Sequence, residues 1–225
     1  MEILCTNGLK SVMTELAPAL ERESRGSVAL IWGSTVGLMK DIAGGAGGDV
    51  AVLTREAIDD LVGQGKVVAG SRIDLARSGI GLAVRKGAHK PDISSPEALR
   101  CALLEAKSVA HSKSGQSGIY FPTVLERLGI NAEVNPKLVV PEGGTPIGDV
   151  VAGGGAEIGI QQISELMPVS GIDIVGPLPA PLQKITIFSA GVLSTAKDPK
   201  GAKAFVDFIS GAARPLLAVK GLEAP

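Results

Sequence analysis

The sequence predicts an α/β fold in which short strands alternate with helices along the whole chain. Short apolar runs such as residues 49–53 (DVAVL) have the length and continuity of strands buried in a sheet that is covered on both faces. Between these runs, apolar residues recur at helical spacing. The 30 glycines and 14 prolines are scattered between the periodic segments, which indicates many short turns. We therefore expect right-handed crossovers and one or two mostly parallel sheets.

The first half of the chain repeats a pattern of strand, small polar turn and helix. A strand at residues 2–5 precedes a helix at 9–22 that Pro18 bends, and a strand at 27–31 of the fully covered type precedes a loop at 33–37. The other elements predicted here are a helix carrying Leu38, Met39 and Ile42, a strand at 49–53, a helix at 55–63, and strands at 66–68 and 80–84.

The second half continues the alternation. A capping box from Ser94 to Glu97, with a proline near the first helical position, predicts a helix that runs through Leu104. The elements predicted after residue 130 are strands at 138–140, 157–160, 171–175 and 185–193, and helices at 146–152, 198–209 and about 212–220.

Residues 108–129 (SVAHSKSGQSGIYFPTVLERLG) combine a strand end, a Gly/Ser loop and an amphipathic helix. Because Pro122 deletes an intrahelical hydrogen bond, we expect the regular helix to begin no earlier than residues 119–120, which leaves the amides around Ser117 and Gly118 free. Unpaired amides and the positive end of the helix dipole attract an oxyanion. A plain turn that binds only water fits this segment equally well.

Composition excludes several classes of function. The chain has 22 Lys and Arg against 23 Asp and Glu, so no overall field favours nucleic acid or an acidic membrane surface. Cys5 and Cys101 are far apart and have no metal-ligand spacing, so we expect no metal site and no cofactor. The dinucleotide and P-loop glycine motifs are absent, and no apolar run has membrane-spanning length. Any preference for anions must therefore be local.

The start of the chain bears on the compartment. Met1 is followed directly by the predicted strand at residues 2–5, with no basic or apolar leader segment. We expect a cytoplasmic protein as the chain is written, or a periplasmic one if a signal peptide has been removed.

Four parts of the chain, in this order, resemble the type II periplasmic binding proteins and, among them, the molybdate-binding branch. They are residues 5–20 (CTNGLKSVMTELAPAL), 33–54 (GSTVGLMKDIAGGAGGDVAVLT), 114–130 (SGQSGIYFPTVLERLGI), and a tail that joins AEIGIQQISEL to GIDIVGPLPAPLQKITIFSAGVLSTAKDPKGAKAFVDFISG. The resemblance covers nearly the whole chain. It rests on the order and spacing of these parts more than on any one of them.

The resemblance implies a two-lobed fold with two crossover hinge strands. Lobe one would comprise residues 1–79 and 188–225, and lobe two residues 80–187. In the family a ligand binds in the cleft between the lobes, which close around it by hinge motion. It also implies a small anionic ligand, an ABC permease as a possible partner, no nucleic acid, no membrane insertion and a monomer.

The family holds its oxyanion with hydroxyls and backbone amides from five places, without a metal. The matching positions of this chain are Asn7 and Gly8, Ser34 and Thr35, Ser117 and Gly118, Thr145 beside Pro146, and Gln162. Two of them depart from the family, since Gly8 replaces a serine and Gln162 replaces a tyrosine. Each lost charge-assisted hydrogen bond costs about 1.5 to 3 kcal/mol, which disfavours molybdate. Gly8 would also open room, and the side-chain amides nearby suit an organic carboxylate.

Other readings of the same residues stay open. Asn7, Thr145 and Gln162 would serve equally well as helix or turn caps. Arg77 would pair either with a ligand carboxylate or with a structural carboxylate. These residues do not by themselves distinguish binding from capping.

An enzyme on the same scaffold is the alternative function. Aconitate isomerase resembles this wider family and moves a proton in a tricarboxylate. Such chemistry needs an acid or base, for which His111 and Tyr120 are the visible candidates. A surface hydrogen-bonding role is favoured for His111, because no partner carboxylate is evident in the sequence. A cytoplasmic ligand sensor is a third possibility.

Overall fold

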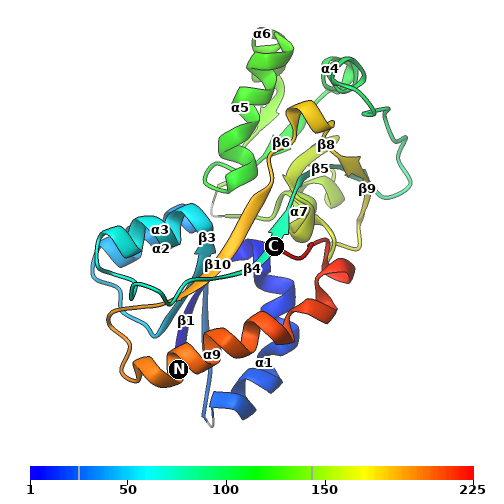
Figure 1. The fold of residues 1–225 in the computed structure, drawn as a ribbon. Coiled ribbons are helices and arrows are strands. Elements are labelled where there is room, and N and C mark those ends of the chain that lie inside the picture. The colour runs from blue at the N-terminus through cyan, green and yellow to red at the C-terminus, as the bar shows by residue number, and fades with distance from the viewer. Residues whose placement is uncertain (25, 143) are drawn as a thin grey trace. The chain divides into compact units, whose positions relative to one another are not determined.

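The chain divides into two compact units in the computed structural model, which describes residues 1–24, 26–142 and 144–225. Unit 1 comprises Met1–Ser78 and Thr186–Pro225, and unit 2 comprises Gly79–Ile185. Each unit contains one five-stranded sheet with helices on its faces (Figure 1). The predicted α/β class is confirmed, and the sheets, which were expected to be mostly parallel, are mixed.

Unit 1 is built on a sheet with the strand order β2-β1-β3-β10-β4. β1 is parallel to β2 and β3, whereas β10 is antiparallel to β3 and β4. Its strands are β1 (Glu2–Thr6), β2 (Ala29–Gly33), β3 (Val50–Thr54), β4 (Ile73–Ser78) and β10 (Thr186–Val192). Its helices are η1 (Asn7–Leu9), α1 (Lys10–Ser24), α2 (Thr35–Ala43), α3 (Arg55–Gly63), α9 (Pro199–Ala212), η4 (Arg214–Leu216) and η5 (Ala218–Lys220).

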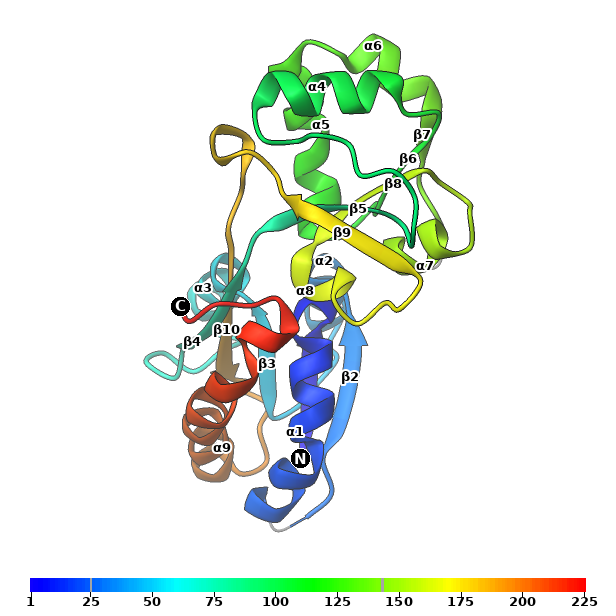
Figure 2. The same ribbon diagram turned by 90° about the vertical axis from the view of Figure 1, so that its right-hand side faces the viewer.

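Helices cover both faces of the sheet in unit 1. Because side chains alternate along a strand, Ile3 and Cys5 pack with α1 and α9, whereas Leu4 packs with α2 and α3. Figures 1 and 2 show α1 and α9 lying along the same face of the sheet. Burial raises the pKa of the Cys5 thiol far above its usual value, so this cysteine is a core residue. Cys101, the other cysteine, is exposed, and both are free thiols.

Unit 2 repeats the scheme with the strand order β7-β6-β8-β5-β9. β6 is parallel to β7 and β8, and β5 is antiparallel to β8 and β9. Its strands are β5 (Ile80–Arg85), β6 (Val109–His111), β7 (Leu138–Val139), β8 (Ile158–Gln162) and β9 (Ile172–Pro177). Its helices are α4 (Pro96–Glu105), α5 (Gln116–Leu128), α6 (Asn131–Val134), η2 (Asn135–Lys137), α7 (Ile147–Ala152), α8 (Ile163–Leu166) and η3 (Ala180–Leu182).

Two cores also flank the sheet of unit 2. One joins Leu82 and Ile160 to the apolar faces of α4, α5 and α6, and the other joins Ala83 and Ala110 to α7 and α8. Helices α4, α5 and α6 gather together in both views of the fold (Figures 1 and 2). Because β6 is parallel to both β7 and β8, the carboxyl ends of these three strands lie at the same edge of the sheet.

Several local predictions were wrong. The strand predicted at 27–31 is β2, an edge strand that is only partly buried. The run at 66–68 makes a single bridge from Val67 to Leu193, whereas β4 was missed. The helix predicted at 212–220 is two short 3₁₀ segments. Ser95, one residue after the expected Ser94, caps α4 by accepting a hydrogen bond from Ala98 N at 3.1 Å.

Candidate functional site

In unit 1 the predicted ligand residues lie at the ends of two neighbouring strands. The register of the parallel pair places Thr6 of β1 beside Gly33 of β2, so the segments that follow these strands are adjacent. Thr35 Oγ1 donates a hydrogen bond to Thr6 Oγ1 at 3.3 Å, which ties the start of α2 to the end of β1. The structure thus brings together Asn7, Gly8, Ser34 and Thr35.

Ser34 caps a helix and can still donate a hydrogen bond from its hydroxyl group. Its Oγ accepts a hydrogen bond from Gly37 N at 3.1 Å and so caps the N-terminus of α2. A serine hydroxyl that accepts one bond can still donate another, so capping and anion binding are compatible at this residue. Asn7, in η1, is partly buried.

Gly8 does not open room as expected. A Cβ atom added to this buried residue would lie 2.4 Å from Cζ of Phe188, which is far too close for two carbon atoms that are not bonded. The space that a family serine would occupy is therefore filled by the phenylalanine side chain of β10. Gly8 can contribute a backbone amide to a ligand, but a hydroxyl at this position requires Phe188 to move.

In unit 2 the central element is the N-terminus of α5, which lies directly after β6. The helix begins at Gln116, three residues earlier than expected, and contains Pro122. The first intrahelical bond runs from Ile119 N to Gly115 O at 3.0 Å, so the preceding amides have no partner within the helix. Gly115 is the N-cap residue and has no side chain with which to cap them. The amides of Ser117 and Gly118 were expected to stay outside the helical hydrogen bonds because the helix would begin after them. They do stay outside, but because they belong to the first turn of α5.

Two serine hydroxyls at this helix terminus are buried without a hydrogen-bond partner, those of Ser112 and Ser117. Ser117 is 1% exposed. Ser112 Oγ lies beside the first turn, because Cβ atoms added to Gly115 and Gly118 would be 2.5 and 2.6 Å from it. Unsatisfied buried hydroxyls are costly, and here they stand next to unpaired amides. Such a cluster of donors is suited to an anion.

Sequence reasoning missed Ser112, although it lies in the same polar loop as Ser117. The only signal was its place directly after the strand that ends at His111. His111 itself is buried, with 8% of its surface exposed, so the surface role expected for it is wrong. Its ring packs against Phe121 with the centroids 5.5 Å apart.

The end of β8 carries a second polar cluster. Gln161 Oε1 accepts a hydrogen bond from Ile147 N at 3.1 Å and thereby caps α7, and its Nε2 donates to Glu165 Oε2 at 2.9 Å. Burial raises the pKa of Glu165 to about 7, although the hydrogen bond from Gln161 acts against this shift. Gln162 is buried as the last residue of β8 and the N-cap residue of α8. Glu165 was also missed by sequence reasoning, although a lone acidic residue within an apolar run could have drawn attention to it.

The remaining candidates have protein partners. The Arg77 guanidinium pairs with the Glu223 carboxylate at 2.8 Å, and the two residues also form a backbone bridge. Thr145 Oγ1 donates to Glu142 O at 3.1 Å in an exposed turn. The Tyr120 hydroxyl accepts from Arg127 at 3.4 Å, and Lys184 lies 5.4 Å above the Tyr120 ring. The structural alternatives for Arg77 and Thr145 are thus both observed.

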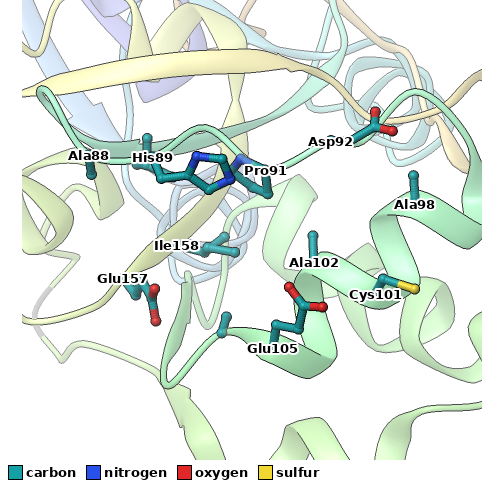
Figure 3. Close-up of a pocket in the computed structure, with 12 residues that line it drawn as sticks. Ala88, His89, Pro91, Asp92, Ala98, Cys101, Ala102, Glu105, Glu157 and Ile158 are labelled. Atoms are coloured by element: carbon teal, nitrogen blue, oxygen red, sulfur yellow. The ribbon is translucent and has the colours of Figure 1, made fainter.

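A pocket of about 350 Å³ lies elsewhere in unit 2, beside α4 (Figure 3). None of the predicted ligand residues lines it. The carboxylates of Glu105 and Glu157 point toward its interior, and Asp92 lies at one side (Figure 3). Three acidic groups and one histidine disfavour an anion here, so this pocket does not extend the α5 site.

The described part of the chain shows neither a metal centre nor a membrane span. No three His, Cys, Asp or Glu side chains among the described residues gather closely enough to hold a metal ion. Within the same residues, no helix has both the length and the apolar character that crossing a membrane needs.

A family model described as bacterial extracellular solute-binding protein matches residues 1–223. The chain belongs to this family. A curated relative named aconitate isomerase, from a Pseudomonas species, is 36% identical over 217 residues and covers 93% of this chain and 82% of its own length. The molybdate-binding protein ModA of Azotobacter vinelandii is 27% identical over 206 residues, with coverage of 88% and 79%.

Solved structures agree with the fold of this solute-binding protein. The periplasmic molybdate-binding protein of Azotobacter vinelandii superimposes with a TM-score of 0.83 at 18% identity, over 100% of this chain and 99% of that one. The resemblance to type II periplasmic binding proteins and their molybdate-binding branch is confirmed. At 18% identity the structural similarity shows that the two proteins share the two-lobed fold, but it does not identify a ligand for this chain.

Proposed function

We propose that this solute-binding protein captures a small anion at the N-terminus of α5 in unit 2. The observation that carries the proposal is Ser117, a residue that is 1% exposed and whose buried hydroxyl has no partner, beside the unpaired first amides of a 13-residue helix. A bound anion would satisfy the hydroxyl and the amides together. An ABC permease would be the natural recipient of the captured solute.

Within this proposal we favour a small carboxylate over a bare tetrahedral oxyanion. Position 8 is a glycine without a hydroxyl, the Phe188 ring would have to move to admit one, and Gln162 has an amide where the family has a phenol. Amides both donate and accept, so they match a ligand that carries carboxyl and hydroxyl groups. Titration calorimetry against molybdate, tungstate, sulfate, and di- and tricarboxylates tests the proposal. Binding by none of them would contradict it.

Ser117→Ala is expected to weaken binding of the tightest of these anions by about 10- to 100-fold, the worth of one hydrogen bond to a charged group. The free energy of unfolding should stay unchanged or rise slightly, because the variant loses a buried hydroxyl that has no partner. Calorimetry and urea unfolding measure the two quantities.

Ser11→Ala is the matched control for Ser117→Ala. Ser11 Oγ is also buried and unpartnered, but it lies on α1 of unit 1 and not at the N-terminus of α5. Equal losses of affinity in the two variants would mean that Ser117 does not contact the ligand.

The second candidate function is a proton-transfer isomerase of a small polycarboxylate, and Glu165 together with the aconitate isomerase relative favours it. A group with a pKa of about 7 can remove a proton from a carbon next to a carboxylate and return it to the far end of the allylic system. No oxidant or other reactant is needed, since one proton leaves and one returns. We favour Glu165 over His111 and Tyr120 as the acid or base, because its raised pKa suits proton transfer near neutral pH.

Incubation with trans-aconitate is expected to change the absorbance of the substrate if this second function holds. Glu165→Gln should then lower the rate by at least about 100-fold while it leaves binding of the tricarboxylate largely intact. A wild-type protein that binds trans-aconitate without any absorbance change would exclude this isomerase and retain the binding function.

A further inference from the structure

Gln161, the fourth residue of β8, bonds two different elements with one side-chain amide. The residue is 4% exposed. Its Oε1 accepts a hydrogen bond from Ile147 N at 3.1 Å, at the start of α7, and its Nε2 donates to Glu165 Oε2 at 2.9 Å, on α8. Because both ends of the buried amide are engaged, the side chain has one position.

The backbone partner also fixes which way the amide faces. Ile147 N–H can only donate, so the amide oxygen must face it. Turning the amide by half a rotation would place its NH₂ group against this N–H and its oxygen against the Glu165 carboxylate. Neither contact would be a hydrogen bond when the carboxylate is ionised, and both polar groups would be buried without partners. The NH₂ group of Gln161 therefore faces Glu165.

This fixed donor distinguishes the two oxygens of Glu165. The hydrogen bond from Gln161 goes to Oε2. A neutral carboxyl group carries its proton on one oxygen and accepts hydrogen bonds better at the other, the carbonyl oxygen. When Glu165 is neutral, Oε2 therefore serves as the carbonyl oxygen and the proton sits on Oε1. Oε1 is the atom at which this carboxyl group loses and regains its proton.

The pair lies at the edge of the sheet to which the α5 loop also belongs. In the parallel register of the two strands, Ile160 of β8 lies opposite His111, the last residue of β6. Gln161 follows Ile160, and the loop that leads into α5 follows His111. Both segments therefore leave the sheet at the same edge.

Few charged side chains lie on the elements packed against α8, which are β5, β8, β9 and α7. β8 has no ionisable side chain, and the others contribute Arg85, Asp173 and Asp149. Arg85 and Asp149 are exposed, and Asp173 accepts a hydrogen bond from a backbone amide in the turn after β5. None of these charges is among the causes of the raised pKa of Glu165, which are burial and, in the opposite direction, the hydrogen bond from Gln161.

We infer that Gln161 is a positioning residue, which holds Glu165 so that Oε1 is the oxygen that transfers the proton. The inference rests on the second candidate function, in which Glu165 is the acid or base. Oε1 takes a proton from a substrate carbon, the electron pair of that C–H bond passes into the allylic system, and the proton returns from Oε1 to the far carbon. Both hydrogen bonds of Gln161 can stay in place throughout.

Two substitutions separate the two bonds of the amide. Gln161→Glu keeps an acceptor for Ile147 N but replaces the donor by a second carboxyl group, whereas Gln161→Met removes both. Without the donor, the pKa of Glu165 should rise by about half a unit to one unit in Gln161→Met. In Gln161→Glu the two carboxyl groups should titrate as a pair, with the upper pKa about one unit or more above that of the wild type.

Carbon-13 NMR of the glutamate carboxyl groups measures these titrations without a ligand, and the signal that disappears in Glu165→Gln belongs to Glu165. Since Gln161→Glu keeps the bond at the start of α7, the measurement does not depend on whether Gln161→Met folds. An unchanged Glu165 titration in Gln161→Glu would overturn the inference.

Gln183→Glu is the matched control. Gln183 Oε1 also accepts from a backbone amide, Ile80 N, at 2.8 Å, but its Nε2 donates to a carbonyl oxygen, Ile80 O, at 2.8 Å. The control therefore introduces the same carboxyl group and loses a similar donor, with no carboxylate as the partner. It should leave the Glu165 titration nearly unchanged. A shift as large as that in Gln161→Glu would overturn the inference.

Turnover of trans-aconitate gives the second readout. The pH at which kcat reaches half of its maximum should move upward in Gln161→Met by the same amount as the pKa of Glu165, and kcat at pH 7 should fall about two- to sixfold with little change in KM. Gln183→Glu should keep the wild-type profile. Turnover whose pH profile does not move in Gln161→Met would overturn the inference. The expected carboxyl titrations without any turnover would overturn the second candidate function, while the proton of Glu165 would still be assigned to Oε1.

Discussion

Gly118→Ala is expected to disrupt the loop before α5 and to abolish anion binding. A Cβ atom at this position would lie 1.7 Å from Ser112 O and 2.6 Å from the carbonyl carbon of the same residue. The obstacle is backbone rather than the end of a flexible side chain, so the loop or the first helical turn has to move. We expect a loss of about 3 kcal/mol or more in the free energy of unfolding and at least about 100-fold weaker binding.

The matched control for this substitution is Gly211→Ala on α9. An added Cβ there meets nothing within 4 Å, so alanine should be neutral or stabilise the protein by up to about 1 kcal/mol through its higher helix propensity. Urea unfolding and calorimetry on both variants separate the close contact from a general effect of alanine. Wild-type stability and affinity in Gly118→Ala would show that Ser112 does not lie against the helix as described.

The elements that sequence reasoning predicted well are those with strong local signals. β3 is buried at every position, and α3 begins and ends at the predicted residues because its apolar face and its threonine cap are continuous in sequence. β4 was missed because its charged residues resemble those of a surface link. Asp74 and Arg77 are in a strand because their partners, Ser189 and Glu223, come from the far end of the chain.

At the candidate site, too, features that depend on residues far apart in the sequence were not predicted. The loop at α5 was predicted from its small residues, but the start of the helix was misplaced because Pro122 was expected to keep the regular helix from beginning before residues 119–120. The helix nevertheless runs from Gln116 to Leu128 with Pro122 in its interior. The Phe188 ring against Gly8 was likewise not predictable, since the two residues are 180 positions apart in the sequence. Contacts of this kind are set by packing and leave no local pattern.

Asp74→Ala is expected to lower the free energy of unfolding by about 2 to 4 kcal/mol. Asp74 Oδ1 accepts from Ser189 Oγ at 2.6 Å and pairs with Arg72 at 2.9 Å, while Oδ2 pairs with Arg55. These contacts join β4 to β10 and α3. Alanine would leave the fully buried Ser189 hydroxyl and the Arg55 guanidinium without their acceptor. Urea unfolding at neutral pH measures the loss.

The pH dependence gives a second test of the same carboxylate. Burial alone would raise the pKa of Asp74, but the hydrogen bonds from Ser189 and Arg55, followed by the charges of Arg55 and Arg72, lower it below its usual value of 3.8. A depressed pKa contributes stability above the unfolded-state value and loses it as the pH falls through the folded-state value. The difference in stability between the wild type and Asp74→Asn should therefore be constant near neutral pH and shrink below about pH 4.

Asp207→Asn is the control for this experiment, because Asp207 forms an ion pair with Lys203 one turn away on the exposed face of α9. An exposed pair of this type contributes at most about 0.5 kcal/mol, and salt screens it. If Asp74→Asn were as mild as Asp207→Asn, the three-element junction would contribute nothing beyond a surface ion pair. If it is far more severe, the rigidity of the unit 1 sheet depends on one carboxylate that joins β4 and β10, the two strands at which the chain leaves unit 1 and returns to it.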